Sequence, residues 1–167
     1  MIALGRKNGF PCAVSRSLGK FRGPGKKEDP CPYATLIMLE LISLYAELRD
    51  TEPARWSVNT LLDLWEHSHT RHPYIFYMGN DFRKLKAPLV WYDILHVADT
   101  LSVYPVAHGD PRFHDMLDVI KSKASPDGKY TAESVWKAWG RWDFGQKKEP
   151  SSWITFLVWR ILRRADG

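Results

Sequence analysis

The sequence KKEPSSW at residues 147–153 is the third copy of a pattern that also occurs as KKEDPCPY at 26–33 and as KLKAPLVW at 84–91. In each copy, basic residues precede a proline and an aromatic residue follows three positions after it. The three prolines are 58 and then 62 residues apart, and an apolar run follows each of them. A regular period of this length indicates a chain built from repeats of about sixty residues.

The residues after each of these prolines predict an inner, buried helix. Proline is favoured in the first turn of a helix, and the segments that follow are apolar on nearly every side. We therefore expect inner helices near residues 31–49, 89–104 and 151–165, each beginning at its proline. Apolar residues spaced three and four apart predict amphipathic outer helices near residues 53–69 and 110–123.

A glycine turn with an aromatic residue precedes the first and the third proline by the same distance. Phe10, after Asn8-Gly9, and Tyr130, after Asp127-Gly128, each lie 20 residues upstream of the proline. Asn-Gly and Asp-Gly are turn signals, so we expect a tight turn at both places. In the last repeat, Thr131 is expected to cap a short helix through the tryptophans that follow it.

These patterns predict an all-α fold of helical hairpins, with long loops before the inner helices. We expect one domain over residues 1–167, with repeats at roughly 8–70, 71–125 and 126–167. The last inner helix has no outer partner and is expected to expose apolar surface. A second copy of the chain, or another part of the protein, is expected to cover that surface.

Composition and charge exclude several classes of protein and favour a globular one. Hydrophobic residues make up 44% and charged residues 26% of the chain, which is typical of a globular protein. No apolar run is long enough for a transmembrane span. Two cysteines make no disulfide framework, so the cytoplasm is the expected location. The net charge of +5 lies in short groups rather than one block, which disfavours a nucleic-acid-binding tail.

Basic residues gather in the loops that precede the inner helices. Because these helices begin from the same kind of loop, we expect their N-termini to meet at one end, where free N–H groups and lysines favour an anion. The expected ligand-binding residues are Lys26, Lys27, Arg83, Lys84, Lys86, Lys147 and Lys148, with an aromatic wall of Tyr33, Trp91 and Trp153, to which Trp136 and Trp139 are further candidates. The alternative is that the lysines keep exposed loops solvated and the tryptophans belong to the core.

Asp93 and His96 lie three positions apart on the second inner helix and therefore share one of its faces. With Tyr92 they would form an acid/base group in a cavity, which makes these three residues the candidate catalytic set. The alternative is that Asp93 stabilises the N-terminus of the helix and His96 is a satisfied core histidine.

The segment His67–His72 contains three histidines at the end of an outer helix. Residues two apart on a helix point in different directions, so His67 and His69 are not expected to hold one metal ion. A cationic helix C-terminus is the preferred interpretation of this segment.

A glycine–aromatic turn that leads through a loop into an inner helix resembles the repeats of terpenoid cyclases and protein prenyltransferases. The sequences at residues 29–35, 81–96 and 144–148 are similar to those of bacterial proteins described as prenyltransferase-like or squalene-cyclase-like. The resemblance implies an α/α toroid and an isoprenoid diphosphate as ligand. Three inner and two outer helices are about half of a closed toroid, so the chain looks like a C-terminal half-barrel whose N-terminal half would be the other candidate to cover the exposed surface. The Asp-x-Asp-Asp and Asp-Asp-x-x-Asp motifs of such enzymes do not occur, so a non-enzymatic helical-repeat interaction module is the alternative function.

The same resemblance implies a zinc site. Protein prenyltransferases hold zinc with an Asp-x-Cys pair and a later histidine, and Asp29, Cys31 and His96 match that set. The alternative is that Cys31 packs as a small apolar residue and Asp29 lies at a helix start.

Overall fold

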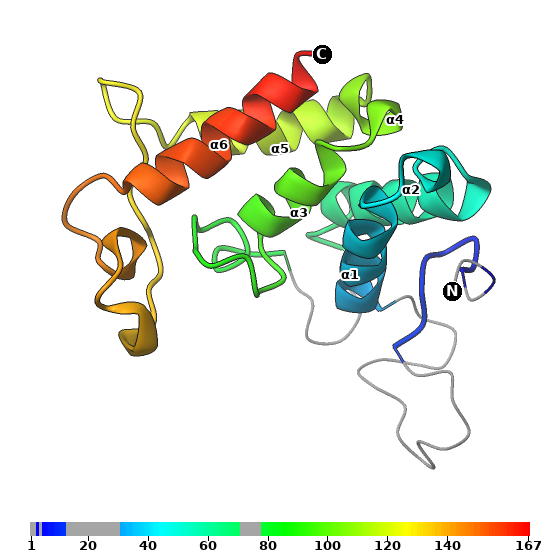
Figure 1. Ribbon diagram of the computed structural model, residues 1–167, viewed down its shortest axis with the longest axis horizontal. Coiled ribbons are helices and arrows are strands. Elements are labelled where there is room, and N and C mark those ends of the chain that lie inside the picture. Colours follow the sequence, from blue (N-terminus) through cyan, green and yellow to red (C-terminus); the bar gives the residue numbers. More distant parts are fainter. Residues whose placement is uncertain (1–2, 4, 13–30, 71–77) are drawn as a thin grey trace, which may run out of the picture. The chain divides into compact units, whose positions relative to one another are not determined.

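The computed structural model describes residues 3, 5–12, 31–70 and 78–167, and the chain divides into two compact units, Met1–Gly79 and Asn80–Gly167 (Figure 1). Every secondary-structure element within the described ranges is a helix, which confirms the expected all-α fold. No helix in these ranges is both long enough and apolar enough to cross a membrane.

Unit 1 is a helical hairpin. Helix α1 (Pro32–Ser43) packs against α2 (Glu52–Glu66), and the short 3₁₀ helix η3 (Ala46–Leu48) lies between them in sequence. Both helices carry a proline in the first turn, where its missing N–H costs nothing. The side chains at the centre of this hairpin are fully buried, among them Leu36, Leu39, Ile42, Leu61 and Leu62.

Unit 2 is built around α3 (Ile94–Leu101), which packs against both α5 (Pro111–Lys121) and α6 (Ser152–Ala165) (Figure 1). Seven of the eight residues of α3 are buried, so this helix is the core of the unit. The remaining elements are α4 (Pro105–His108) and the 3₁₀ helices η4 (Lys137–Trp139) and η5 (Asp143–Gly145).

Two expected helices differ from the sequence prediction. The second inner helix begins at Ile94 rather than near residue 89, because Asp93 takes the N-cap position and accepts hydrogen bonds from the N–H groups of Leu95 and His96. The segment after Thr131 forms only the two 3₁₀ turns. A Cβ at Gly145 would clash with the backbone carbonyl of Trp139, so the chain folds back here too tightly for one continuous helix.

The glycines of the two turns share one kind of backbone conformation. Gly9 and Gly128 both adopt a positive φ, which glycine tolerates without strain. The aromatic residues beyond them, Phe10 and Tyr130, are both buried. The first and third repeats therefore share this turn as well as their inner helix.

Candidate functional site

A pocket of about 200 Å³ lies in unit 2, between the loop that leads to α3 and the segment that leads to η4. Two hydrogen bonds join these segments: Leu85 N–H donates to the Glu133 carboxylate at 2.8 Å, and Glu133 N–H donates to the Leu85 carbonyl at 2.9 Å. Lys123 lies 2.8 Å from the same carboxylate. The lining residues are Asp81, Lys86, Ala87, Trp91, Ser134, Val135 and Trp136.

The charged side of the pocket is an ion pair. The Lys86 side chain is only 11% exposed, and its Nζ lies 2.8 Å from Asp81 Oδ2. Lys84 Nζ lies 3.3 Å from Asp81 Oδ1. The hydrogen bond from Lys86 holds the pKa of the Asp81 carboxyl below its usual range, so this carboxylate is ionised at neutral pH. One carboxylate thus pairs with two lysines, of which Lys86 lines the pocket and Lys84 lies beside it, so the group of three carries a net positive charge.

The apolar side of the pocket is a pair of tryptophans. Trp91 and Trp136 meet edge to face, with ring centroids 4.7 Å apart and an angle of 75° between the planes. Trp136 is 57% exposed, so its ring forms the open edge of the pocket. A ligand with one anionic end and one apolar end would find a complementary group for each.

The candidate catalytic residues do not line this pocket. Asp93 acts as the N-cap of α3, with its Oδ1 accepting from two backbone N–H groups at 3.1 Å. Its Oδ2 is buried and has no hydrogen-bond partner in the described chain, and burial raises its pKa to about 7. His96 Nδ1 lies 2.7 Å from the Trp91 carbonyl, and the Tyr92 ring packs against Phe82. The cap is the role that the structural alternative expects of Asp93, and the catalytic role of the three residues stays a prediction.

The helix N-termini proposed as an anion site are filled by side chains of the chain itself. Asp93 covers the N-terminus of α3, and at α6 the Asp143 Oδ2 accepts from Ser151 Oγ and Trp153 N–H, both at 2.9 Å. Burial acts to raise the pKa of Asp143, but these hydrogen bonds outweigh it and the net shift is downward. An anionic ligand would therefore meet lysine side chains rather than free N–H groups.

The other expected binding residues lie apart from the pocket or outside the described residues. Lys147 and Lys148 are exposed in the loop before α6, where the Gln146 side chain accepts from the Lys148 N–H. Tyr33 belongs to α1 of unit 1, and Arg83, although it lies in the loop before α3, does not line the pocket. Lys26 and Lys27 lie outside the described residues.

Of the three residues expected to hold zinc, Asp29 lies outside the described residues. Cys31 is the N-cap of α1, and its Sγ accepts from the Ala34 N–H at 3.4 Å. Burial raises the pKa of this thiol to about 11. Cys31 and His96 belong to different compact units.

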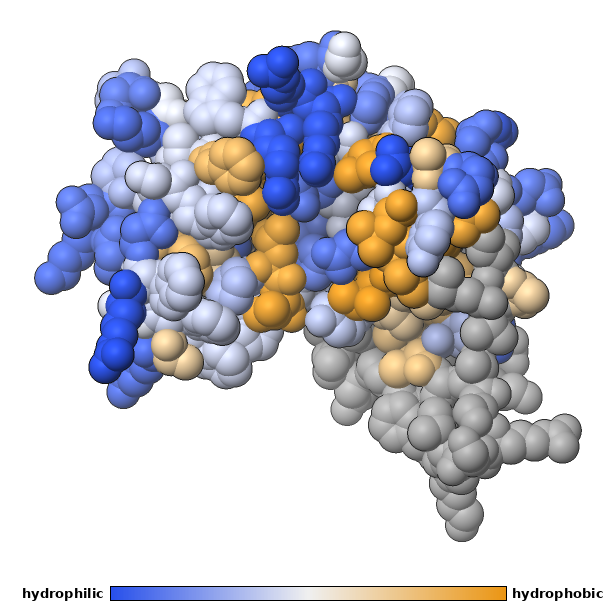
Figure 2. All heavy atoms as spheres, in the orientation of Figure 1, coloured by the Kyte–Doolittle hydropathy of each residue, from blue (hydrophilic) through white to orange (hydrophobic). Residues whose placement is uncertain are grey.

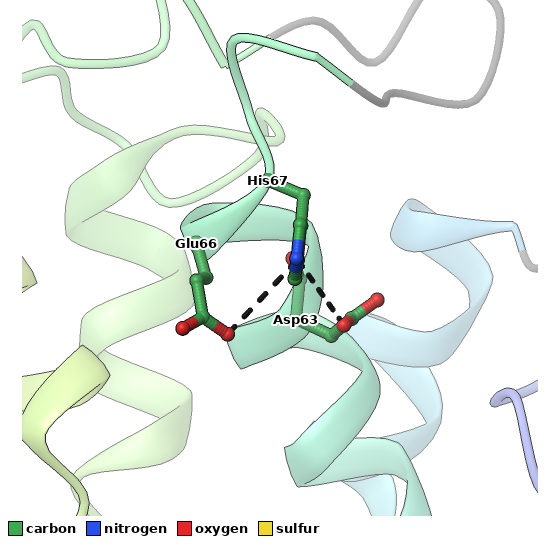
Figure 3. Close-up of side chains that lie close together, drawn as sticks. All are labelled: Asp63, Glu66 and His67. Atoms are coloured by element: carbon green, nitrogen blue, oxygen red, sulfur yellow. Dashed lines mark hydrogen bonds and ion pairs between the residues drawn. The ribbon is translucent and has the colours of Figure 1, made fainter.

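A group of possible metal ligands lies instead at the last turn of α2, where Figure 3 shows His67 beside Asp63 and Glu66. His67 Nδ1 is 3.3 Å from Asp63 Oδ1 and 4.0 Å from Glu66 Oε2, and one ligand atom from each residue falls within 4.8 Å of the others. The same Nδ1 lies 3.0 Å from the Asp63 carbonyl, which fits the interpretation of His67 as a group that stabilises a helix C-terminus.

Comparisons of the chain with protein-family models, with curated proteins and with solved structures found no match. The site is therefore described from its own geometry. Sequence reasoning found Lys86, Trp91 and Trp136, and it missed Asp81 and Glu133. The short distance in sequence between Asp81 and the two lysines, Lys84 and Lys86, could have indicated the ion pair. Nothing in the local sequence indicates that residues 85 and 133 pair.

Proposed function

We propose that this chain is a terpenoid-cyclase-like or prenyltransferase-like helical repeat domain that binds an isoprenoid diphosphate or a similar anionic ligand at the pocket of unit 2. The observation that supports the proposal is the juxtaposition of a buried lysine, Lys86, with Trp91 and Trp136 around one cavity. The lysines would bind the phosphate groups, and the tryptophans would pack against the hydrocarbon.

The size of the pocket limits how much of the ligand it takes. Pockets that enclose a drug-sized molecule measure about 300–1,000 Å³, and this one is smaller, at about 200 Å³. We therefore expect it to hold the diphosphate and the first part of the hydrocarbon, while the rest of the chain extends over the exposed Trp136. The proposal concerns binding and assigns no reaction.

Calorimetric titration tests the proposal, with inorganic diphosphate and farnesyl diphosphate as probes, each with and without zinc. Saturable binding of both is expected, with higher affinity for the isoprenoid. Lys86→Met is expected to abolish binding of both probes, whereas Lys121→Met, which removes an exposed ion-paired lysine elsewhere in unit 2, is the matched control. Trp136→Ala is expected to remove only the additional affinity for farnesyl diphosphate.

Two results would count against the proposal. Binding of neither probe by the folded protein would reject the pocket as an anion site. Binding that Lys86→Met leaves intact would place the anion elsewhere. A response that appears only with zinc, and that Cys31→Ser removes, would support the Asp29, Cys31 and His96 set instead.

A second candidate function is a helical-repeat module that binds a protein partner, and one observation favours it. On α1, the face formed by Tyr33, Ile37, Leu41 and the following Leu44 is exposed although it is apolar. These positions recur every three or four residues, so they form one stripe. If a second copy covers the stripe, the protein is a dimer in solution, and Ile37→Glu with Leu41→Glu converts it to a monomer.

A further inference from the structure

The last fifth of the chain is rich in both tryptophan and basic residues. Residues 134–167 contain five of the eight tryptophans, and they contain seven Lys or Arg against three Asp or Glu. This segment thus carries a net charge of +4, whereas the whole chain carries +5. The remaining 133 residues are close to neutral. Most of the tryptophan and most of the net positive charge of this protein thus lie at one end of the sequence.

Several aromatic side chains of this segment are exposed on the surface of unit 2. One face of α6 is buried through Ile154, Leu157, Val158 and Ile161. The opposite face presents large aromatic side chains that are roughly half exposed: Trp153 at 44%, Phe156 at 51% and Trp159 at 55%. A helix of a globular protein normally turns polar residues outward. An exposed aromatic face of this kind is typical of an interaction surface.

A further tryptophan adjoins the start of that face. Trp142 is 58% exposed and directly precedes Asp143, whose carboxylate accepts the N–H of Trp153 at 2.9 Å. That hydrogen bond ties the turn that carries Trp142 to the first turn of α6. Trp142, Trp153, Phe156 and Trp159 thus lie on neighbouring elements of unit 2.

The aromatic rings are held in place before any partner binds. Trp153 stacks on Phe156 with centroids 5.5 Å apart, and Trp142 stacks on Phe144 at 5.8 Å. The Arg160 guanidinium lies 5.6 Å from the centroid of the Phe156 ring, and Asp99 holds it at 2.7 Å. Ordered rings lose little side-chain entropy on docking, so their exposure is useful to binding.

Three exposed basic side chains flank the rings. Lys147 and Lys148 lie in the loop before α6, and Arg163 lies one turn beyond Trp159. All three are exposed, and none forms an ion pair within the described part of the chain. In Figure 2 strongly hydrophilic residues lie beside pale ones over the left part of the view, where the chain runs from η4 to the start of α6; tryptophan is pale on this hydropathy scale.

We propose that this aromatic–basic surface, formed by Trp142, Trp153, Phe156, Trp159, Lys147, Lys148 and Arg163, docks on the surface of a membrane that contains anionic phospholipid. Tryptophan is the side chain most suited to the boundary between headgroups and hydrocarbon, because its ring is apolar and its N–H is polar. Lysine and arginine beside it are attracted to anionic headgroups. The surface supplies both contributions, which stable attachment to a membrane surface requires together.

A single-stranded nucleic acid fits this surface less well. Bases stack on aromatic rings arranged along a positively charged groove. Here three of the four rings already stack on an aromatic ring of the same chain, and three lie along the outer face of one helix. The inference goes beyond the proposed function, since none of its residues lines the pocket of unit 2.

Sedimentation of the full chain with vesicles tests the inference. Vesicles of phosphatidylcholine alone are compared with vesicles in which part of it is replaced by phosphatidylglycerol. We expect binding to the anionic vesicles that weakens as salt is added, with a blue shift of tryptophan fluorescence. Trp153→Ala with Trp159→Ala, and separately Lys147→Glu with Lys148→Glu, should each reduce the affinity by about tenfold or more.

Matched controls separate docking from a loss of folding. Tyr45→Ala removes an aromatic side chain of similar exposure in unit 1, and Lys121→Glu reverses an exposed charge in unit 2 outside this surface. Both should bind vesicles as the unmodified chain does. Circular dichroism melts of every variant verify folding, and Lys86→Met should leave vesicle binding unchanged because it acts on the pocket alone.

Three outcomes would overturn the inference. The first is a folded chain that ignores anionic vesicles. The second is binding that the tryptophan and lysine variants leave unchanged. The third is binding of a single-stranded oligonucleotide that these variants abolish, in the absence of vesicle binding, which would assign the surface to nucleic acid.

Discussion

Thr155 Oγ1 accepts a hydrogen bond from the backbone N–H of Tyr130 at 3.0 Å, and the same bond occurs 120 residues earlier, where Thr35 Oγ1 accepts from Phe10 N–H at 2.9 Å. The carbonyl of each aromatic residue in turn accepts from the residue that caps the inner helix. Cys31 N–H donates to Phe10 at 3.2 Å, and Ser151 N–H donates to Tyr130 at 2.9 Å. In the first and the third repeat, the same pair of contacts thus fastens the loop to its inner helix.

Removal of the threonine hydroxyl should destabilise both repeats to different degrees. Thr35 is fully buried, so Thr35→Val leaves the Phe10 N–H without a partner and should cost about 1–3 kcal/mol in free energy of unfolding. Thr155→Val should cost less, because water reaches its partly exposed site. Chemical denaturation measures both values. The exposed Thr70→Val is the control, and a similar loss there would show that the hydroxyls of Thr35 and Thr155 have no special role.

The buried Asp93 should make stability depend on pH. Its pKa in the folded chain is about 7, above the 3.8 of the exposed group, so the folded state binds more protons than the unfolded state between these values. The stabilisation from this proton is complete below about pH 4 and is lost as the pH rises through 7. Asp93→Asn retains an acceptor for the cap and removes the titration.

Urea denaturation from pH 4 to 8 measures the free energy of unfolding of the unmodified chain and of Asp93→Asn. The quantity of interest is the difference between the two. We expect the difference to move in favour of the asparagine variant as the pH rises, by an amount on the order of a few kcal/mol. A difference that stays constant across this range would mean that Asp93 does not titrate there.

The carboxylate of Asp143 should stabilise α6 as a cap supplied from outside the helix. Asp143→Ala leaves Trp153 N–H and Ser151 Oγ without this acceptor and should cost about 1–2 kcal/mol. Asp143→Asn retains an acceptor and should cost less. Thermal unfolding followed by circular dichroism makes the comparison, with Asp166→Ala at the other end of α6 as a control that changes stability little. Equal losses for the two Asp143 variants would assign the effect to charge rather than to capping.

Asp81 should weaken the binding of anions at the pocket, because it already neutralises part of the positive charge of Lys84 and Lys86. Asp81→Asn is therefore expected to raise the affinity for inorganic diphosphate by about threefold to tenfold. Calorimetric titration gives the two dissociation constants. A lower affinity in the variant would indicate that Asp81 orients the lysines for the ligand instead of competing with it.

Most helices lie where the sequence predicts them, and the later start of the second inner helix has a clear cause. Alignment on the prolines placed the second inner helix at residue 89, but the equivalent helix caps are Cys31, Asp93 and Ser151. An aspartate side chain that satisfies two N–H groups fixes a helix start more strongly than a proline five residues earlier. The pocket was anticipated through Lys86 and Trp91, whereas its compensating charge on Asp81 was not.

The sequence alone determined the all-α class, the glycine turns and the amphipathic outer helices, because turn residues, caps and apolar periodicity act over a few residues. The tertiary structure decided which distant side chains meet. Only the packed chain brings Glu133 to Leu85 and so closes the pocket, and only there does Asp99 hold Arg160 over Phe156. These contacts join residues 48 and 61 positions apart, and no local pattern encodes a meeting that depends on how whole helices pack.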